Sequence, residues 1–272
     1  MQLILVPTDF SQQARNAAIH ACNIAKHFNA RVMLFHAYML PTPVSEVPYV
    51  MVTVDELQKE NENVIKNEAE ALHQTHDVEI EWLVRIGIPS DEIRVLTEER
   101  EIDLVVMGMK GVGGLDKIIG STTTNAINKV SKPVLIIPQD ARFQAYKKIT
   151  FATDLHFEIK PKAFVVLTQM AKQFDASVHI VHVNKKNENP YRDEVEWRRI
   201  IETYFAGVEH DFNMIENASV MHGINSFIEQ HSSELLAMIP HKHTFFERLF
   251  NRSQTKAMAY ETRIPLLVMQ LK

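Results

Sequence analysis

Short apolar runs alternate along the chain with segments in which apolar residues recur at helical spacing. In the first half, the apolar runs predict strands near residues 2–6, 31–37, 78–84, 103–108 and 133–138. Between the first two runs, apolar positions recur at i, i+3, i+4 and i+7, which predicts an amphipathic helix with Ser11 as its N-cap. This alternation favours right-handed crossovers and a parallel sheet that is covered by helices on both faces.

The second half of the chain repeats the first. Four segments recur in the same order: 3–10 with 149–155, 28–36 with 174–182, 84–90 with 220–226, and 133–137 with 265–269. The repeat is far longer than a solenoid unit, so each copy is expected to be a whole domain. We predict two tandem, five-stranded, doubly wound α/β domains, at residues 1–141 and 146–272, joined by a short polar stretch.

Composition and charge exclude several classes of protein. Of the 272 residues, 46% are hydrophobic and 23% are charged, which is typical of a globular protein. The net charge of −5 gives no basic surface for nucleic acid, and no apolar run approaches the length of a membrane helix. Residues 1–7 read as a strand rather than a signal peptide, and the one cysteine cannot form an internal disulfide. We expect a cytoplasmic protein without a nucleic-acid or membrane partner.

Several conspicuous side chains are expected to serve packing or solvation. Cys22 lies on the apolar stripe of the first helix, which favours a buried, unreactive thiol. Trp82 and Trp197 are interpreted as packing residues. The polar stretch 55–70 is interpreted as the solvated face of a helix.

Glycine is concentrated in one loop. The chain has eight glycines, and five of them fall within residues 108–120: Gly108, Gly111, Gly113, Gly114 and Gly120. This loop follows the fourth predicted strand, and Ser121 and Thr122 open a helical pattern directly after it. Ligands of doubly wound sheets bind beyond the carboxyl ends of the strands, and glycines with a helix N-terminus favour phosphate. The sequence therefore predicts an oligophosphate site, although the loop is neither a Walker A motif nor a Rossmann fingerprint.

Three motifs together resemble the universal stress protein family. They are Val6-Pro-Thr-Asp-Phe-Ser11 after the first strand, Gly108-x2-Gly111…Gly120-Ser121 after the fourth, and Pro133-Val-Leu-Ile-Ile-Pro138 at the end of the repeat. The resemblance covers the whole chain as two copies with an adenine nucleotide alpha hydrolase-like fold. It implies that the final strands, 133–138 and 265–269, pair as an intramolecular pseudo-dimer; further homodimerisation is left open. ATP-binding members carry G-x2-G-x9-G-(S/T), whereas eight residues, 112–119, separate Gly111 from Gly120 here.

The resemblance also implies a ligand and its contacts. The ligand is ATP or another adenine nucleotide, with or without Mg²⁺. Asp9 would bind the ribose, the backbone around Ala37 would border the adenine, and the glycine loop would hold the phosphates. The full set is Pro7, Thr8, Asp9, Ala37, Met107, Gly108, Met109, Gly111, Gly120, Ser121 and Thr122. From the residues alone, Asp9 has a second interpretation, because an Asp just before Ser11 can help to cap the first helix.

The second copy has lost the glycine loop. Pro240, His243 and about Arg252 stand at its glycine positions in the sequence alignment, although Asp154 is retained after the first strand. We predict that the second domain does not bind ATP in the family's manner and is structural or binds a partner. Its histidines give a weak case for a metal, since His179 and His182 are three apart on a strand and face opposite sides.

Three hypotheses for the function remain open. The first is a nucleotide-binding regulatory protein, with a stress-response role implied by the resemblance. The second is slow ATP hydrolysis or phosphoryl transfer, for which Lys110, Asp116 and Lys117 are candidates but form no catalytic constellation. The third is a protein-interaction scaffold that binds no nucleotide. No catalytic residue is assigned.

Overall fold

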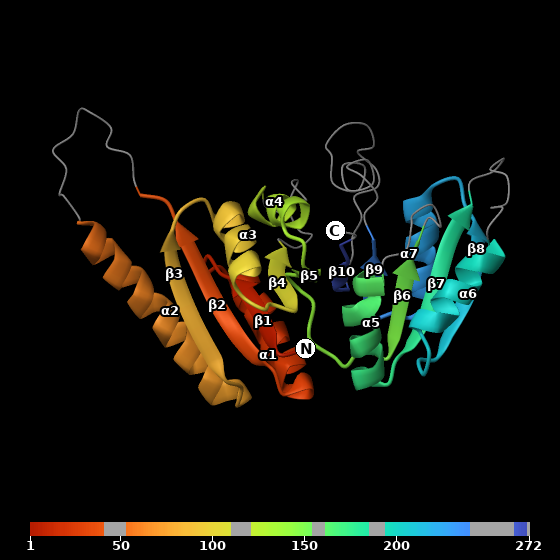
Figure 1. The fold of residues 1–272 in the computed structure, drawn as a ribbon, viewed down its shortest axis with the longest axis horizontal. Coiled ribbons are helices and arrows are strands. Elements are labelled where there is room, and N and C mark those ends of the chain that lie inside the picture. The colour runs from red at the N-terminus through yellow and green to blue at the C-terminus, as the bar shows by residue number, and fades with distance from the viewer. Residues whose placement is uncertain (41–52, 110–120, 154–160, 185–193, 240–263, 271–272) are drawn as a thin grey trace. The chain divides into compact units, whose positions relative to one another are not determined.

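The computed structural model describes residues 1–40, 53–109, 121–153, 161–184, 194–239 and 264–270 (Figure 1). By residue contacts, this described part of the chain divides into two compact units. The first unit contains the described residues of 1–108 and 121–132. The second contains Met109 and the described residues from Pro133 onward. No helix in these ranges is long and apolar enough to cross a bilayer.

The first unit is a parallel sheet with helices, as predicted. Its elements are β1 (Leu3–Pro7), α1 (Gln12–Phe28), β2 (Arg31–Tyr38), α2 (Val54–His76), β3 (Ile80–Ile86), α3 (Pro89–Glu99), β4 (Leu104–Met109) and α4 (Ser121–Lys129). The strand order is β3-β2-β1-β4, and every pair is parallel. Strand β1 is almost fully buried and lies between β2 and β4. The residues that follow its carboxyl end are therefore flanked by the ends of both neighbouring strands.

The first helix begins and ends where local chemistry dictates. The Ser11 side chain accepts a hydrogen bond from the Ala14 amide at 3.2 Å, which confirms the predicted N-cap. Asn29 ends the helix in the left-handed conformation that such a C-cap requires. Between these caps the apolar stripe is buried, including the Cys22 thiol, as expected.

The second unit contains the second repeat together with β5. Its elements are β5 (Val134–Pro138), β6 (Lys148–Ala152), α5 (Pro161–Phe174), β7 (Ser177–Asn184), α6 (Glu194–Tyr204), β8 (His210–Glu216), α7 (Val220–His231), β9 (Leu235–Met238) and β10 (Leu266–Val268). Strand β5 pairs antiparallel with β10, whereas the other pairs in the order β10-β9-β6-β7-β8 are parallel. The last strand of one repeat thus hydrogen-bonds to the last strand of the other. The pseudo-dimer and the domain limits 1–141 and 146–272 stay predictions.

Some sequence interpretations of the fold differ from the structure. Trp82 is 38% exposed instead of packed, because it lies on β3 at the edge of the sheet, whereas Trp197 is buried as expected. Helix α2 has one buried acid, Glu68, on a face interpreted as solvated. The match of 84–90 with 220–226 is not structural, since the first segment joins β3 to α3 and the second lies inside α7.

Candidate functional site

The candidate site begins where β1 turns into α1. The Thr8 amide still donates to the Phe35 carbonyl of β2 at 2.8 Å, and the buried Thr8 hydroxyl then accepts from the Phe10 amide at 3.0 Å. The exposed Asp9 carboxylate accepts from the Ser11 amide at 3.1 Å. Asp9 therefore holds the amide of the N-cap residue, whereas the Ser11 side chain caps the helix itself. A carboxylate offers about four lone-pair sites, so this bond leaves capacity to accept from a ligand hydroxyl.

Beside it, the carboxyl end of β2 carries a fixed histidine. His36 Nδ1 donates to the Thr8 carbonyl at 2.8 Å, which makes the ring a link between the ends of β1 and β2. The His36 ring also lies 4.5 Å from that of Phe10 and 6.0 Å from that of Tyr38. Ala37, the predicted neighbour of the adenine, is half-buried next to it.

At the carboxyl end of β4 lies Gly108, where close contact with α1 leaves no room for a side chain. A Cβ on Gly108 would lie 2.3 Å from the Gln13 carbonyl oxygen and 3.0 Å from the Ala14 nitrogen. No side chain fits there, because the atoms that it would meet are backbone atoms in the first turn of α1. Gly108 therefore brings the end of β4 against the start of α1. Helix α4 also reaches this residue, because its Thr123 hydroxyl donates to the Gly108 carbonyl oxygen at 3.5 Å.

The predicted residues that the structure describes converge on this edge. At the ends of β1, β2 and β4 and the first turn of α4 lie Pro7, Thr8, Asp9, Ala37, Met107, Gly108, Met109, Ser121 and Thr122. Met107 is buried in the sheet, whereas Met109 and Thr122 are half-buried. Gly111, Gly120, Lys110, Asp116 and Lys117 lie outside the described residues.

A buried carboxyl beneath this edge was missed from the sequence. Glu68 of α2 is 6% exposed, and its Oε1 lies 3.7 Å from Nε of Arg15 in α1. Burial raises the pKa of Glu68; Arg15 opposes that shift and the charge of Asp9 adds to it. Arg15 in the first turns of α1 and Glu68 within α2 therefore form an ion pair whose carboxyl also experiences the charge of Asp9. A charged residue inside a polar helical stretch gives no periodic signal that would have marked it.

The second unit has the same threonine and histidine hydrogen bonds at the carboxyl ends of its strands. The Thr153 amide donates to the Val181 carbonyl at 3.0 Å, and His182 Nδ1 donates to the Thr153 carbonyl at 2.9 Å. Thr153 and His182 therefore repeat Thr8 and His36. The histidines close the repeated segments 28–36 and 174–182, so the repeat itself was a signal that could have identified His36.

The second unit differs at β9, the equivalent of β4. Continuing the register of β1 with β4 places Thr8 beside Gly108, and continuing that of β6 with β9 places Thr153 beside Ile239. The prediction from sequence that Pro240 stands at the position of Gly108 is therefore wrong by one residue. The strand register fixes which residues are equivalent, whereas the sequence of a loop does not. A buried isoleucine stands where the first unit has a glycine. Asp154, Pro240, His243 and Arg252 lie outside the described residues.

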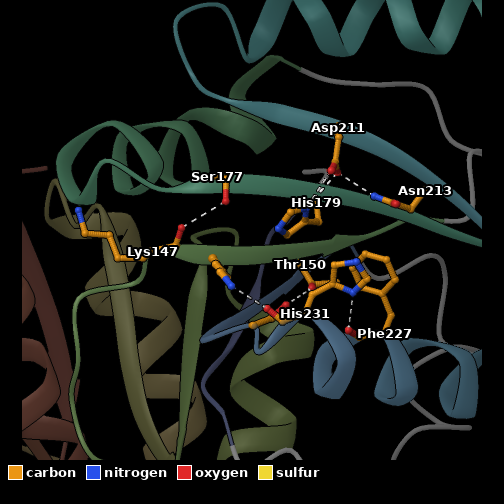
Figure 2. A network of polar contacts seen from close by, with 10 residues as sticks. Lys147, Thr150, Ser177, His179, Asp211, Asn213, Phe227 and His231 are labelled. Atoms are coloured by element: carbon orange, nitrogen blue, oxygen red, sulfur yellow. Dashed lines mark hydrogen bonds and ion pairs between the residues drawn. The ribbon is translucent and has the colours of Figure 1, made fainter.

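The histidines of the second unit lie in separate hydrogen-bonding arrangements. Figure 2 shows His179 held by Asp211, whose carboxylate is 3.0 Å from His179 Nδ1, and His231 donating to the Phe227 carbonyl at 3.0 Å. His182 lies on the opposite face of β7, as its spacing from His179 predicted. Among the described residues, no group of three His, Cys, Asp or Glu side chains could hold a metal ion.

Comparison with known proteins agrees with this architecture. The model of the universal stress protein family matches residues 1–138, half of the chain. The chain belongs to the universal stress protein family. It is 34% identical over 142 residues to universal stress protein MJ0531 of Methanocaldococcus jannaschii, covering 49% of this chain and 80% of that protein. MJ0577 of the same organism is 29% identical over 150 residues, covering 49% and 93%.

Solved structures match this universal stress protein over nearly its whole length. A universal stress protein from Archaeoglobus fulgidus superposes with a TM-score of 0.75, covering 98% of each chain at 17% identity. At this identity the likeness concerns the fold alone. It extends the α/β fold from the matched first half to the second.

Proposed function

We propose that the first unit binds an adenine nucleotide, with ATP as the first candidate, and that the protein acts as a regulator in a stress response. Family membership supports the regulatory role. The observation that carries the ligand is the convergence at Gly108, where the ends of β1 and β4 meet the first turn of α1 and the start of α4. Such an edge is where doubly wound sheets bind ligands.

The groups at this edge fit the two ends of a nucleotide. The exposed Asp9 carboxylate would accept from ribose hydroxyls, and its negative charge favours keeping it away from the phosphates. The amides of the first turn of α4, with Ser121 and Thr122, would donate to the phosphates, because a helix N-terminus has free N–H groups and a positive dipole end. The backbone beside Ala37 would border the base.

The second unit, in this proposal, has a structural or partner-binding role. It keeps the Thr153 and His182 arrangement but carries Ile239 where Gly108 draws the edge together in the first unit. One nucleotide per chain is therefore expected.

A thermal-shift titration of the full chain with ATP tests this proposal. A ligand that binds only the folded state stabilises it by about 2.7 kcal/mol at a hundredfold excess over its Kd. The shift should be present in the wild type and absent in Gly120→Arg, which puts a bulky side chain into the glycine motif. Asn125→Arg, an exposed position farther along α4, is the matched control and should keep the shift. A wild type that shows no shift with ATP, ADP or AMP would contradict the proposal.

A further inference from the structure

Strand β3 forms an edge of the first unit's sheet (Figure 1). Within the described ranges it pairs with β2 alone. The Glu79 carbonyl accepts from Val32 of β2, and the Gly87 amide donates to Tyr38 of β2. Because alternate residues of a parallel strand bond to the same neighbour, the odd-numbered residues of β3 face β2. The amides and carbonyls of Ile80, Trp82, Val84 and Ile86 therefore point outward from the sheet.

These outward-facing positions lack the features that usually protect a sheet edge. Proline and charged residues commonly block such edges from pairing with another chain. Here all four positions are apolar, and two of the side chains are well exposed, Trp82 at 38% and Ile86 at 42%. Among the described residues, the edge therefore presents both unpaired backbone groups and apolar surface.

The sequence of β3 is complementary to itself when reversed. In Ile80-Glu-Trp-Leu-Val-Arg-Ile86, a two-fold axis through Leu83 sets Ile80 opposite Ile86, Glu81 opposite Arg85, and Trp82 opposite Val84. In this register the outward-facing residues become the hydrogen-bonded pairs, as the antiparallel ladder demands. Glu81 and Arg85 become a pair whose side chains approach closely, with opposite charges.

We propose that β3 is a homodimer interface, at which it pairs antiparallel with β3 of a second copy of this chain. The charged residues of the strand do not oppose such a contact. Glu81 pairs with Arg31 at 3.4 Å, and Arg85 pairs with Glu99 at 2.5 Å and with Glu92 at 3.6 Å. The two-fold adds an attraction between Glu81 of one copy and Arg85 of the other. This contact is independent of nucleotide binding.

Strand β8, at the equivalent position in the second repeat, provides a contrast. It pairs with β7 in the described ranges, and the bonds from Val178 to Glu209 and from Asn217 to Asn184 give it the same phase as β3. Its outward positions are His210, Phe212, Met214 and Glu216. Reversal about its central residue, Asn213, would set Asp211 against Ile215, and the Arg198 guanidinium already lies over the Phe212 ring at 4.5 Å. Strand β8 therefore lacks the self-complementarity of β3.

Sedimentation of the full chain over a wide range of concentrations tests the proposed interface. The wild type should show a monomer–dimer equilibrium. Trp82→Lys should raise the dimer Kd at least about tenfold, as expected when a buried aromatic anchor is lost. Met214→Lys, at an exposed outward position on β8, should leave the Kd unchanged.

Cysteine cross-linking tests the register. Residue 83 opposes itself across the two-fold, so Leu83→Cys should form a disulfide-linked dimer under mild oxidation, since such facing pairs have Cα atoms close enough for a disulfide. Asn213→Cys should not cross-link, and the native Cys22 is buried. A chain that stays monomeric at every concentration would overturn the proposal. So would a dimer that Trp82→Lys leaves intact and Leu83→Cys does not cross-link.

Discussion

The carboxyl ends of the strands begin alike in the two units and then diverge. In both, a threonine amide extends the ladder beyond the first strand and a histidine Nδ1 donates to that threonine's carbonyl, at 2.8 Å for His36 and 2.9 Å for His182. The next strand then carries Gly108 in one unit and Ile239 in the other. The hydrogen bonds between threonine and histidine are thus alike in both units, whereas the close backbone approach at Gly108 is replaced by a buried side chain at Ile239.

The largest effect is expected from replacing Gly108 of the first unit by isoleucine, the residue that the second unit carries at the equivalent position, Ile239. Gly108→Ile would force a side chain against the backbone of Gln13, which cannot move aside without disturbing the start of α1. Overpacking of this kind costs roughly 1–3 kcal/mol, occasionally more. Urea denaturation should show the loss of stability, and ATP should no longer shift the melting temperature. Unchanged stability would mean that the glycine is not required by packing.

A smaller loss of stability, equal in both units, is expected from removing either of the two equivalent histidines, His36 and His182. His36→Ala and His182→Ala each remove a hydrogen bond to a threonine carbonyl, at a cost of about 1–2 kcal/mol each. Urea denaturation of the two variants, with exposed His27→Ala as the control, measures this. If one substitution is costly and the other neutral, the two arrangements are not equivalent and the comparison fails.

The smallest effect is expected at Glu68, which is not one of the predicted nucleotide contacts. The described part of the second unit has no buried acid that corresponds to it. Its folded-state pKa is raised by burial, so the folded protein keeps the proton to a higher pH than the unfolded chain. The contribution of Glu68 to the free energy of unfolding therefore falls as pH rises through the range above the ordinary glutamate pKa. Glu68→Gln cannot ionise and should lack this fall, so its stability relative to the wild type should rise with pH.

Urea denaturation across that pH range measures the effect, with Glu70→Gln, an exposed acid on the same helix, as the control. A difference between variant and wild type that does not change with pH would show that the Glu68 carboxyl has the same pKa in the folded and unfolded chain.

The periodic parts of the fold were readable from the sequence. Strands β1 to β5 lie within about two residues of the apolar runs, and Ser11 caps α1 as predicted. These features depend on local spacing and on burial, which a single sequence records. Trp82 was misread because its exposure depends on β3 being an edge strand, a property of strand order rather than of local pattern.

The candidate site was only partly readable for a similar reason. Asp9 and Gly108 stand in recognisable motifs, but the reason for the glycine, contact with Gln13, lies about a hundred residues away in the chain. His36 and Glu68 act through partners that are brought to them by tertiary packing. The one-residue error at Ile239 arose because loop residues were aligned without the strand register.

Native mass spectrometry of the purified full chain with added ATP tests the central asymmetry most directly. The account predicts one nucleotide per chain in the wild type and none in Gly120→Arg. Two nucleotides per chain would contradict the asymmetry between the units, and a wild type that binds none under conditions where the folded protein is intact would contradict the proposed site itself.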